Sequence, residues 1–278
     1  MKPQIRRILF SIAVLIWSAV ILYFYSSGRI NQYLTPDFRV IAFAGGLGLA
    51  VLGLFNLLTA GQKADCGHDH SDDDVDPHDH ESSDMHPLTA VALMILPVAL
   101  SVAWTKDQYS VAALTRKGLY SSPSASAGKP FLAAAMPEIT LEQIEKGHRK
   151  TPEGYLEFSL MELFFTAGDR DLQKLISGLK VETEGRWIDE KVRNPNGTRK
   201  RLYRLFITCC AADGQAIPII LEFGKIPTES FPENSWVKVS GTMRYLMEEE
   251  MIQPVLEVER IIAAEPPFEE SFTRDKKF

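Results

Sequence analysis

Three long apolar segments constrain this chain more than any other feature. They span residues 8–25, 40–60 and 88–104, and none of them contains Asp, Glu, Lys, Arg or His. At a rise of about 1.5 Å per helical residue, each comes close to the ~30 Å hydrocarbon thickness of a bilayer. We therefore predict an α-helical membrane region of three spans within residues 1–104.

The first segment has one alternative interpretation, a cleaved signal peptide. Its apolar run is long for that role, and no A-x-A-like cleavage site follows in "SSGRINQY". A retained membrane span is the favoured interpretation.

The second segment carries small residues at three- and four-residue spacings. Ala42, Gly46, Ala50 and Gly53 share one helical face, and such faces let helices approach closely in lipid. Transport pathways usually carry ionisable groups within the membrane. The uncharged spans therefore favour an anchor or accessory subunit over a transporter that acts alone.

Basic residues beside the spans predict the orientation. Lys2, Arg6 and Arg7 precede the first span, which favours a cytoplasmic N-terminus. Arg29 and Arg39 lie in the loop on the opposite side and argue against it. With the favoured orientation, the chain is a multi-pass protein of the inner or plasma membrane. Its 61–87 loop is then cytoplasmic and its C-terminal domain extracytoplasmic.

The 61–87 loop contains the stretch "CGHDHSDDDVDPHDHESSDMH", which holds five of the six histidines of the chain. Imidazole and thiolate are ligands for zinc and related transition metals, and the surrounding acids attract cations. A loop with little hydrophobic content cannot fix ligands rigidly. We predict a flexible tether that weakly binds Zn²⁺ or another transition metal; the alternative is an acidic loop that binds nothing. The candidate ligands are Cys66, His68, His70, His78, His80 and His86.

Residues 105–136 are rich in small residues and proline and predict a linker. Residues 137–278 then read as a soluble, β-rich domain. Capping-box spacings at Thr140/Gln143 and Ser159/Glu162 predict helix starts, and a third short helix is expected over residues 169–177.

Five alternating segments predict strands. Gly185 and Gly241 interrupt two of them, as glycines do at barrel corners. The fold class we expect is therefore an α+β domain with an OB-like five-stranded β-barrel; a small β-sandwich or another α+β fold is the alternative. The strand segments are 179–190, 199–210, 216–224, 235–246 and 252–265.

The first hairpin of this domain is basic. We predict a solvated hairpin whose charges protect an edge strand from pairing, and no nucleic-acid partner. His148, in "KGHRK", is predicted to be a surface residue. No Ser/His/Asp group, P-loop, dinucleotide fingerprint or HExxH motif is present, so no enzymatic activity is expected. The basic residues of the hairpin are Lys191, Arg193, Arg199, Lys200, Arg201 and Arg204.

Adjacent cysteines end the second strand segment in "FITCCAADG". Successive side chains of a regular strand point to opposite faces, so Cys209 and Cys210 converge only if the chain turns there. Three interpretations stay open: one cysteine packs in the core, the pair binds metal or does redox chemistry with Asp213 nearby, or the two form a vicinal disulfide. Asp213 can also simply shape the turn.

Together these residues resemble a known family. Three spans, the third with a mid-helix Leu-Pro, precede a β-rich domain with "FITCCAAD" and a later "WVKVSG", as in the YcgQ-like family of permease subunits. The resemblance covers most of the chain. It implies an accessory subunit that acts with a separate multi-span permease and a link to metal homeostasis, and it carries over no catalytic residues. The long linker and the basic hairpin depart from the family's simplest pattern.

Three functional hypotheses follow. The leading one is an accessory subunit of a permease, linked to divalent, zinc-like metal transport or homeostasis, with the His/Asp-rich loop capturing metal. The partners would then be the multi-span permease, the lipid bilayer and transition-metal ions. The second is a membrane-anchored binding or envelope-interaction module without transport. The third is a thiol-redox protein that uses Cys209 and Cys210.

Overall fold

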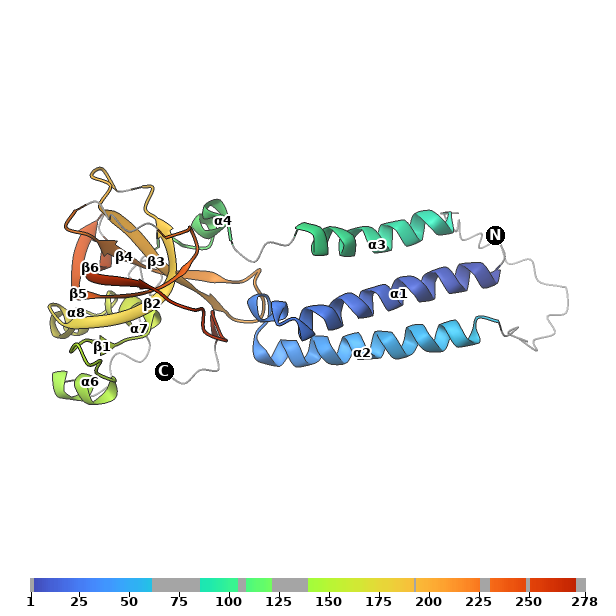
Figure 1. The fold of residues 1–278 in the computed structure, drawn as a ribbon, viewed down its shortest axis with the longest axis horizontal. Coiled ribbons are helices and arrows are strands. Elements are labelled where there is room, and N and C mark those ends of the chain that lie inside the picture. The colour runs from blue at the N-terminus through green and yellow to red at the C-terminus, as the bar shows by residue number, and fades with distance from the viewer. Residues whose placement is uncertain are drawn as a thin grey trace, which may run out of the picture. The chain divides into compact units, whose positions relative to one another are not determined.

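The computed structural model describes residues 3–61, 86–104, 109–121, 140–192, 194–225, 231–248 and 251–273. The chain divides into two compact units, Met1–Asp107 and Gln108–Phe278 (Figure 1). The first consists of helices and the second contains a β-sheet with short helices, as the fold class predicted from the sequence requires.

The first unit contains three helices that are long and apolar enough to cross a membrane. They are α1 (Pro3–Ser26), α2 (Pro36–Thr59) and α3 (Pro87–Trp104), with a short 3₁₀ helix, η1 (Arg29–Gln32), between the first two. Pro97 lies inside α3. By length and composition this unit is compatible with membrane insertion, in agreement with the sequence pattern.

Glycines of α2 bring it close to α1. A Cβ atom at Gly53 would lie 2.8 Å from Leu15 Cγ, and one at Gly46 would lie 3.0 Å from Ile21 Cγ2. The Ser18 hydroxyl of α1 also donates to the Gly46 carbonyl at 2.7 Å. The close packing predicted for this face is therefore confirmed at both glycines, and the partner is a helix of the same chain.

The second unit is built on a closed, mixed β-barrel of five strands. Its ring order is β2-β5-β6-β4-β3, closed by a further pairing of β2 with β3. Only β4 and β6 pair in parallel within this ring, and the other pairs are antiparallel. This confirms the predicted OB-like barrel. The strands are β2 (Lys180–Asp189), β3 (Arg199–Ile207), β4 (Gln215–Glu222), β5 (Trp236–Glu248) and β6 (Met251–Ala263).

Two glycines lie where the barrel strands bend. The register between β5 and β6 shifts at Gly241, and a Cβ there would lie only 2.0 Å from the Glu257 carbonyl oxygen. Gly185 directly precedes Arg186, the residue at which β2 passes from pairing with β5 to pairing with β3. Since any larger residue at 241 would collide with backbone, this position requires glycine.

Three short helices accompany the barrel: α6 (Leu141–Gly147), α7 (Leu160–Thr166) and α8 (Arg170–Ile176). The capping boxes predicted at Thr140/Gln143 and Ser159/Glu162 are both formed. Short strands β1 (Leu156–Glu157) and β7 (Phe272–Thr273) pair in parallel with β2 and β3. The main core lies between α7 and the barrel strands, with Leu160, Leu163, Ile219, Val239 and Leu256 fully buried.

Residues 109–121, here called the strap, lie within the segment that the sequence predicted as linker. They include α4 (Val111–Arg116), and Leu114 and Leu119 are fully buried in a second apolar cluster with Tyr203 and Ile207 of β3. The strap therefore packs as part of the second unit.

A buried ion pair fixes the C-terminal end of the strap. Arg201 and Glu190 form it with side chains that are each 1% exposed. The Arg201 guanidinium also donates to the Leu119 carbonyl at 3.0 Å and lies over the Tyr120 ring. Breaking such a pair on one side leaves an uncompensated buried charge, so the pair holds Arg201 where it contacts the strap.

The basic hairpin is not the solvated edge predicted from the sequence. β3 pairs with both β2 and β4, and Arg204 is buried, donating to backbone carbonyls of Glu269 and Glu270. Arg199 pairs with Glu222 at 2.5 Å and Lys200 with Asp189 at 2.6 Å. The prediction was wrong because it assumed that β3 is an edge strand, whereas β3 pairs with a neighbouring strand on each side in the closed ring.

Candidate functional site

The adjacent cysteines lie in a turn directly after β3. The strand ends at Ile207, and the following residues, 208–214, form what is here called the Cys loop. Because the chain turns there, the Cys209 and Cys210 sulfurs are 3.7 Å apart. One ligand atom from each cysteine and from Asp213 all lie within 4.8 Å of one another. Among the described residues, this is a group that could hold a metal ion.

Asp213 holds the Cys loop in this conformation. Its Oδ2 accepts the Cys209 N–H at 3.0 Å and its Oδ1 accepts the Cys210 N–H at 3.3 Å. The Asp213 N–H in turn donates to the Cys210 carbonyl at 3.1 Å. The aspartate therefore shapes the turn, as the sequence suggested, and the same turn gathers the thiols.

Lys117 of the strap secures the other side of the Cys loop. Its ammonium group donates to the carbonyls of Ala211, Ala212 and Gly214 at 2.7, 3.2 and 3.2 Å. The backbone carbonyl of Lys117 also accepts the Ala216 N–H at 2.7 Å. Since one side chain satisfies three carbonyls that face it, the loop is ordered by the strap as well as by its own hydrogen bonds.

The two thiols have different acidities. The Ala212 N–H, the Cys209 side chain and the Asp213 N–H lower the pKa of the Cys210 thiol. The Asp213 carboxylate and the Cys210 side chain raise the pKa of Cys209 to about 11. Burial raises the pKa of the Asp213 carboxyl, but hydrogen bonds from Cys209 and the nearby backbone outweigh it and lower that pKa. Cys210 is therefore the thiol that ionises first.

The other predicted ligands lie elsewhere in the chain. Cys66, His68, His70, His78 and His80 fall outside the described residues. His86 is exposed at the start of α3, where its carbonyl accepts the Thr89 N–H at 2.8 Å and its Nδ1 accepts the Leu88 N–H at 3.4 Å. Within the described residues, His86 therefore accepts hydrogen bonds from backbone N–H groups at the N-terminus of α3.

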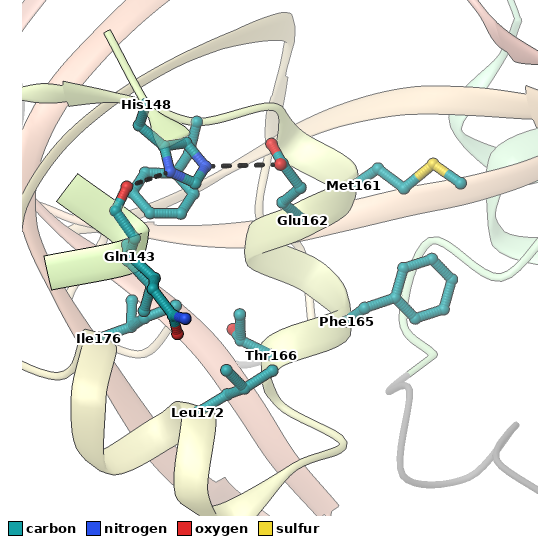
Figure 2. A pocket seen from close by; sticks show the side chains of 10 residues that line it. Gln143, His148, Met161, Glu162, Phe165, Thr166, Leu172 and Ile176 are labelled. Atoms are coloured by element: carbon teal, nitrogen blue, oxygen red, sulfur yellow. Dashed lines mark hydrogen bonds and ion pairs between the residues drawn. The ribbon is translucent and has the colours of Figure 1, made fainter. Parts of the chain in front are cut away.

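A second candidate site is an open cavity of about 760 Å³ lined by residues of α6, α7 and α8. Its lining is mostly apolar, and its size lies within the range of roughly 300–1,000 Å³ of small-molecule sites. Figure 2 shows His148 and Glu162 on one side of it and Leu172 and Ile176 on the other. This cavity can hold an organic molecule but offers few groups for a bare ion.

Its polar groups are few and well held. The His148 ring stacks on Phe158 at a centroid distance of 3.8 Å, and its Nε2 lies 3.4 Å from Glu162 Oε1. The Tyr245 hydroxyl donates to Thr166 at 2.6 Å, and burial raises the pKa of Tyr245 to about 12. The side chain of His148 is 18% exposed, so the residue predicted to lie at the surface is half-buried in the wall of the cavity.

Sequence reasoning missed Lys117 and the cavity. Lys117 is followed by Gly118-Leu119-Tyr120, and the buried leucine beside a glycine was a weak signal that the segment folds. The cavity had no signal, because α6, α7 and α8 enclose it only through their tertiary arrangement.

The class that these observations define is a helical, membrane-compatible region joined to an OB-like barrel. Two family models match the chain: the DUF1980 N-terminal domain over residues 9–118 and the DUF1980 C-terminal domain over residues 174–270. The chain is therefore similar to both domains of DUF1980, an uncharacterised family. No curated protein matches it.

Proposed function

We propose that this chain is the accessory subunit of a membrane permease that handles a divalent, zinc-like metal. The observation that carries the proposal is the Cys loop: two thiols and a carboxylate gathered by a turn, in a chain with three helices long and apolar enough to cross a membrane. Thiolate, imidazole and carboxylate together suit zinc and related ions.

The composition of the helices supports an accessory role. The three apolar segments contain no Asp, Glu, Lys, Arg or His, whereas ion pathways usually carry such groups within the membrane. A separate multi-span protein would supply the path. The His/Asp-rich loop would gather metal on the cytoplasmic side, and the barrel with its Cys loop would act on the extracytoplasmic side.

Metal accumulation in cells that express the chain tests this proposal. We expect accumulation to change when His68, His70, His78, His80 and His86 are replaced together by alanine. The control is His148→Ala, which removes the one histidine outside this group. Tagged chain should also co-purify with a multi-span protein. Unchanged uptake and export in the five-histidine variant would contradict a transport role for the loop.

The cavity between α6, α7 and α8 favours a second candidate function. A membrane-anchored binding module would use the barrel to bind a small apolar molecule and would not transport metal. Such a module keeps its function when residues 1–104 are exchanged for an unrelated membrane anchor. An accessory subunit loses its function in that exchange, because its helices contact the permease.

A further inference from the structure

We propose that Cys209, Cys210 and Asp213 form a three-ligand site for one tetrahedral ion of the Zn²⁺ class, with the fourth position open to an exchangeable ligand. The inference deepens the metal-handling part of the proposed function and is independent of the permease partner. It assigns the ion, the ligands and an exchange role to the Cys loop.

The separation of the sulfurs favours a tetrahedral ion. Zinc–sulfur bonds of about 2.3 Å at a tetrahedral angle place two sulfurs roughly 3.8 Å apart, and the Cys209 and Cys210 sulfurs are 3.7 Å apart. A linear two-coordinate ion at the same bond length needs roughly 4.6 Å, and a disulfide needs about 2.05 Å. Both cysteines are free thiols. The pair is thus spaced for a tetrahedral ion without prior rearrangement.

Asp213 completes the ligand set. Its carboxylate accepts one backbone N–H on each oxygen, and a carboxylate offers about four lone-pair sites. At least one oxygen can therefore bind the ion while its hydrogen bond orients it, in the way that outer hydrogen bonds orient metal ligands. On binding, each thiol gives its proton to solvent, because the ligand is the thiolate.

The Cys loop is preorganised by groups that do not bind the metal. Lys117 donates to three loop carbonyls from the strap, and the strap is in turn fixed by Leu114, Leu119 and the buried Arg201–Glu190 pair. The positions of the ligands are therefore set before the metal arrives, which lowers the cost of binding.

The number of ligands favours exchange. Structural zinc sites are closed by four protein ligands, whereas sites with three keep a position for another ligand. Within the described residues, the group consists of Cys209, Cys210 and Asp213, with both thiols half-exposed and the carboxylate exposed. Neither core cluster includes them, so the site lies outside the hydrophobic core. Such a site can accept a metal from a donor and pass it on.

Titration of the full chain in detergent with Co²⁺ alone tests the inference, because tetrahedral thiolate-bound Co²⁺ absorbs strongly in the visible range. The background protein carries Cys66→Ser and Ala in place of His68, His70, His78, His80 and His86, so that the His/Asp-rich loop does not contribute. We expect one tetrahedral Co²⁺ per chain, displaced by Zn²⁺. We further expect the spectrum to be lost in both Cys209→Ser and Cys210→Ser, and Asp213→Asn to weaken binding about tenfold or more.

Asp171→Asn is the matched control, since Asp171 is an exposed aspartate on α8, and it should leave Co²⁺ binding unchanged. Folding of each variant is followed by hydrogen exchange of the barrel strands, and the two serine variants decide the inference if Asp213→Asn changes that exchange. A weak octahedral spectrum, a spectrum that survives both serine variants, or a disulfide between the two cysteines in the purified chain would overturn the inference. If tetrahedral binding is found but cellular metal accumulation does not depend on the chain, the inference stands and the proposed function fails.

Discussion

The Cys loop and the cavity lined by α6, α7 and α8 lie in the same unit, but different kinds of contact hold them in place. The Cys loop is small, and hydrogen bonds from Asp213 and Lys117 hold it. The cavity is larger and mostly apolar, and packed side chains hold it, with one histidine–glutamate pair at its side. The first arrangement suits an ion and the second an organic molecule.

The two candidate sites of the second unit are therefore held by different sets of contacts. The Cys loop depends on the strap, whereas the cavity depends on α6, α7, α8 and the main core. Since the two sets of supporting contacts differ, variants in one set should leave the other site unchanged.

The largest effect is expected from Arg201→Met. It leaves Glu190 as an uncompensated buried charge and removes the bond to the Leu119 carbonyl. Loss of one partner of a buried pair costs about 3–5 kcal/mol in the free energy of unfolding. We expect chemical denaturation to show that loss, and hydrogen exchange to accelerate first in residues 109–121.

Arg244→Met is the control for that variant. Arg244 pairs with Glu257 at 2.8 Å, but the two side chains are 58% and 40% exposed, so its loss should cost at most about 1 kcal/mol. Equal destabilisation by the two variants, or faster exchange in α6–α8 before the strap, would show that the Arg201–Glu190 pair does not hold the strap separately.

Leu172→Trp should lower the binding of an apolar probe to the cavity by about tenfold. Leu172 lines the cavity, and Leu172→Trp places a larger side chain there. We expect photolabelling of α6–α8 by a diazirine-tagged medium-chain alcohol to fall by about tenfold. This fall corresponds to a loss of roughly 1.4 kcal/mol in the free energy of probe binding, because the larger side chain occupies space in which the probe would make apolar contacts. Tetrahedral Co²⁺ binding at the Cys loop should not change.

Lys174→Trp serves as its control, because the Lys174 side chain on the same helix is 76% exposed and lies outside the cavity lining. It should leave the labelling near that of the parent chain. Equal labelling of the Leu172→Trp variant and the parent chain would show that the probe does not enter the cavity.

The smallest effect is a difference in the rates at which the two thiols react. The pKa of Cys210 is lowered and that of Cys209 is raised to about 11, so at pH 8 a larger fraction of Cys210 is thiolate. In a Cys66→Ser chain, iodoacetamide should modify Cys210 several-fold faster than Cys209, as mass spectrometry of the peptides can measure. In Asp213→Asn the pKa of Cys209 should fall, and Cys209 should react faster. Equal rates in the parent chain would contradict the assigned acidities.

Much of the fold followed from local patterns in the sequence. Uncharged apolar runs predicted three helices, and the capping residues Thr140 and Ser159 predicted where α6 and α7 begin. Alternation and Gly241 predicted strands with a bend. Each of these signals depends on a few neighbouring residues and on a single physical requirement. The corresponding element can therefore be predicted without knowledge of the tertiary fold.

The features that the sequence did not predict depend on contacts between residues far apart in the chain. Strand alternation separates Cys209 from Cys210, and only the turn after Ile207 brings their sulfurs together. The strap looked like a linker because Leu114 and Leu119 stand among small and polar residues, and their partners lie far along the chain in β2, β3 and β4. Arg201 looked solvated because Glu190 is its partner only after the hairpin closes. The predicted ligands from Cys66 to His80 lie outside the described residues and stay predictions.

X-ray absorption at the zinc edge tests directly whether the Cys loop binds metal through its thiols. The sample is the full chain with Cys66→Ser and alanine in place of the five histidines of the His/Asp-rich loop, loaded with one equivalent of Zn²⁺. We expect two sulfur ligands at about 2.3 Å together with oxygen ligands at about 2.0–2.2 Å, and loss of the sulfur shell in Cys210→Ser. A shell of oxygen or nitrogen alone in the loaded chain would contradict a metal role for the Cys loop.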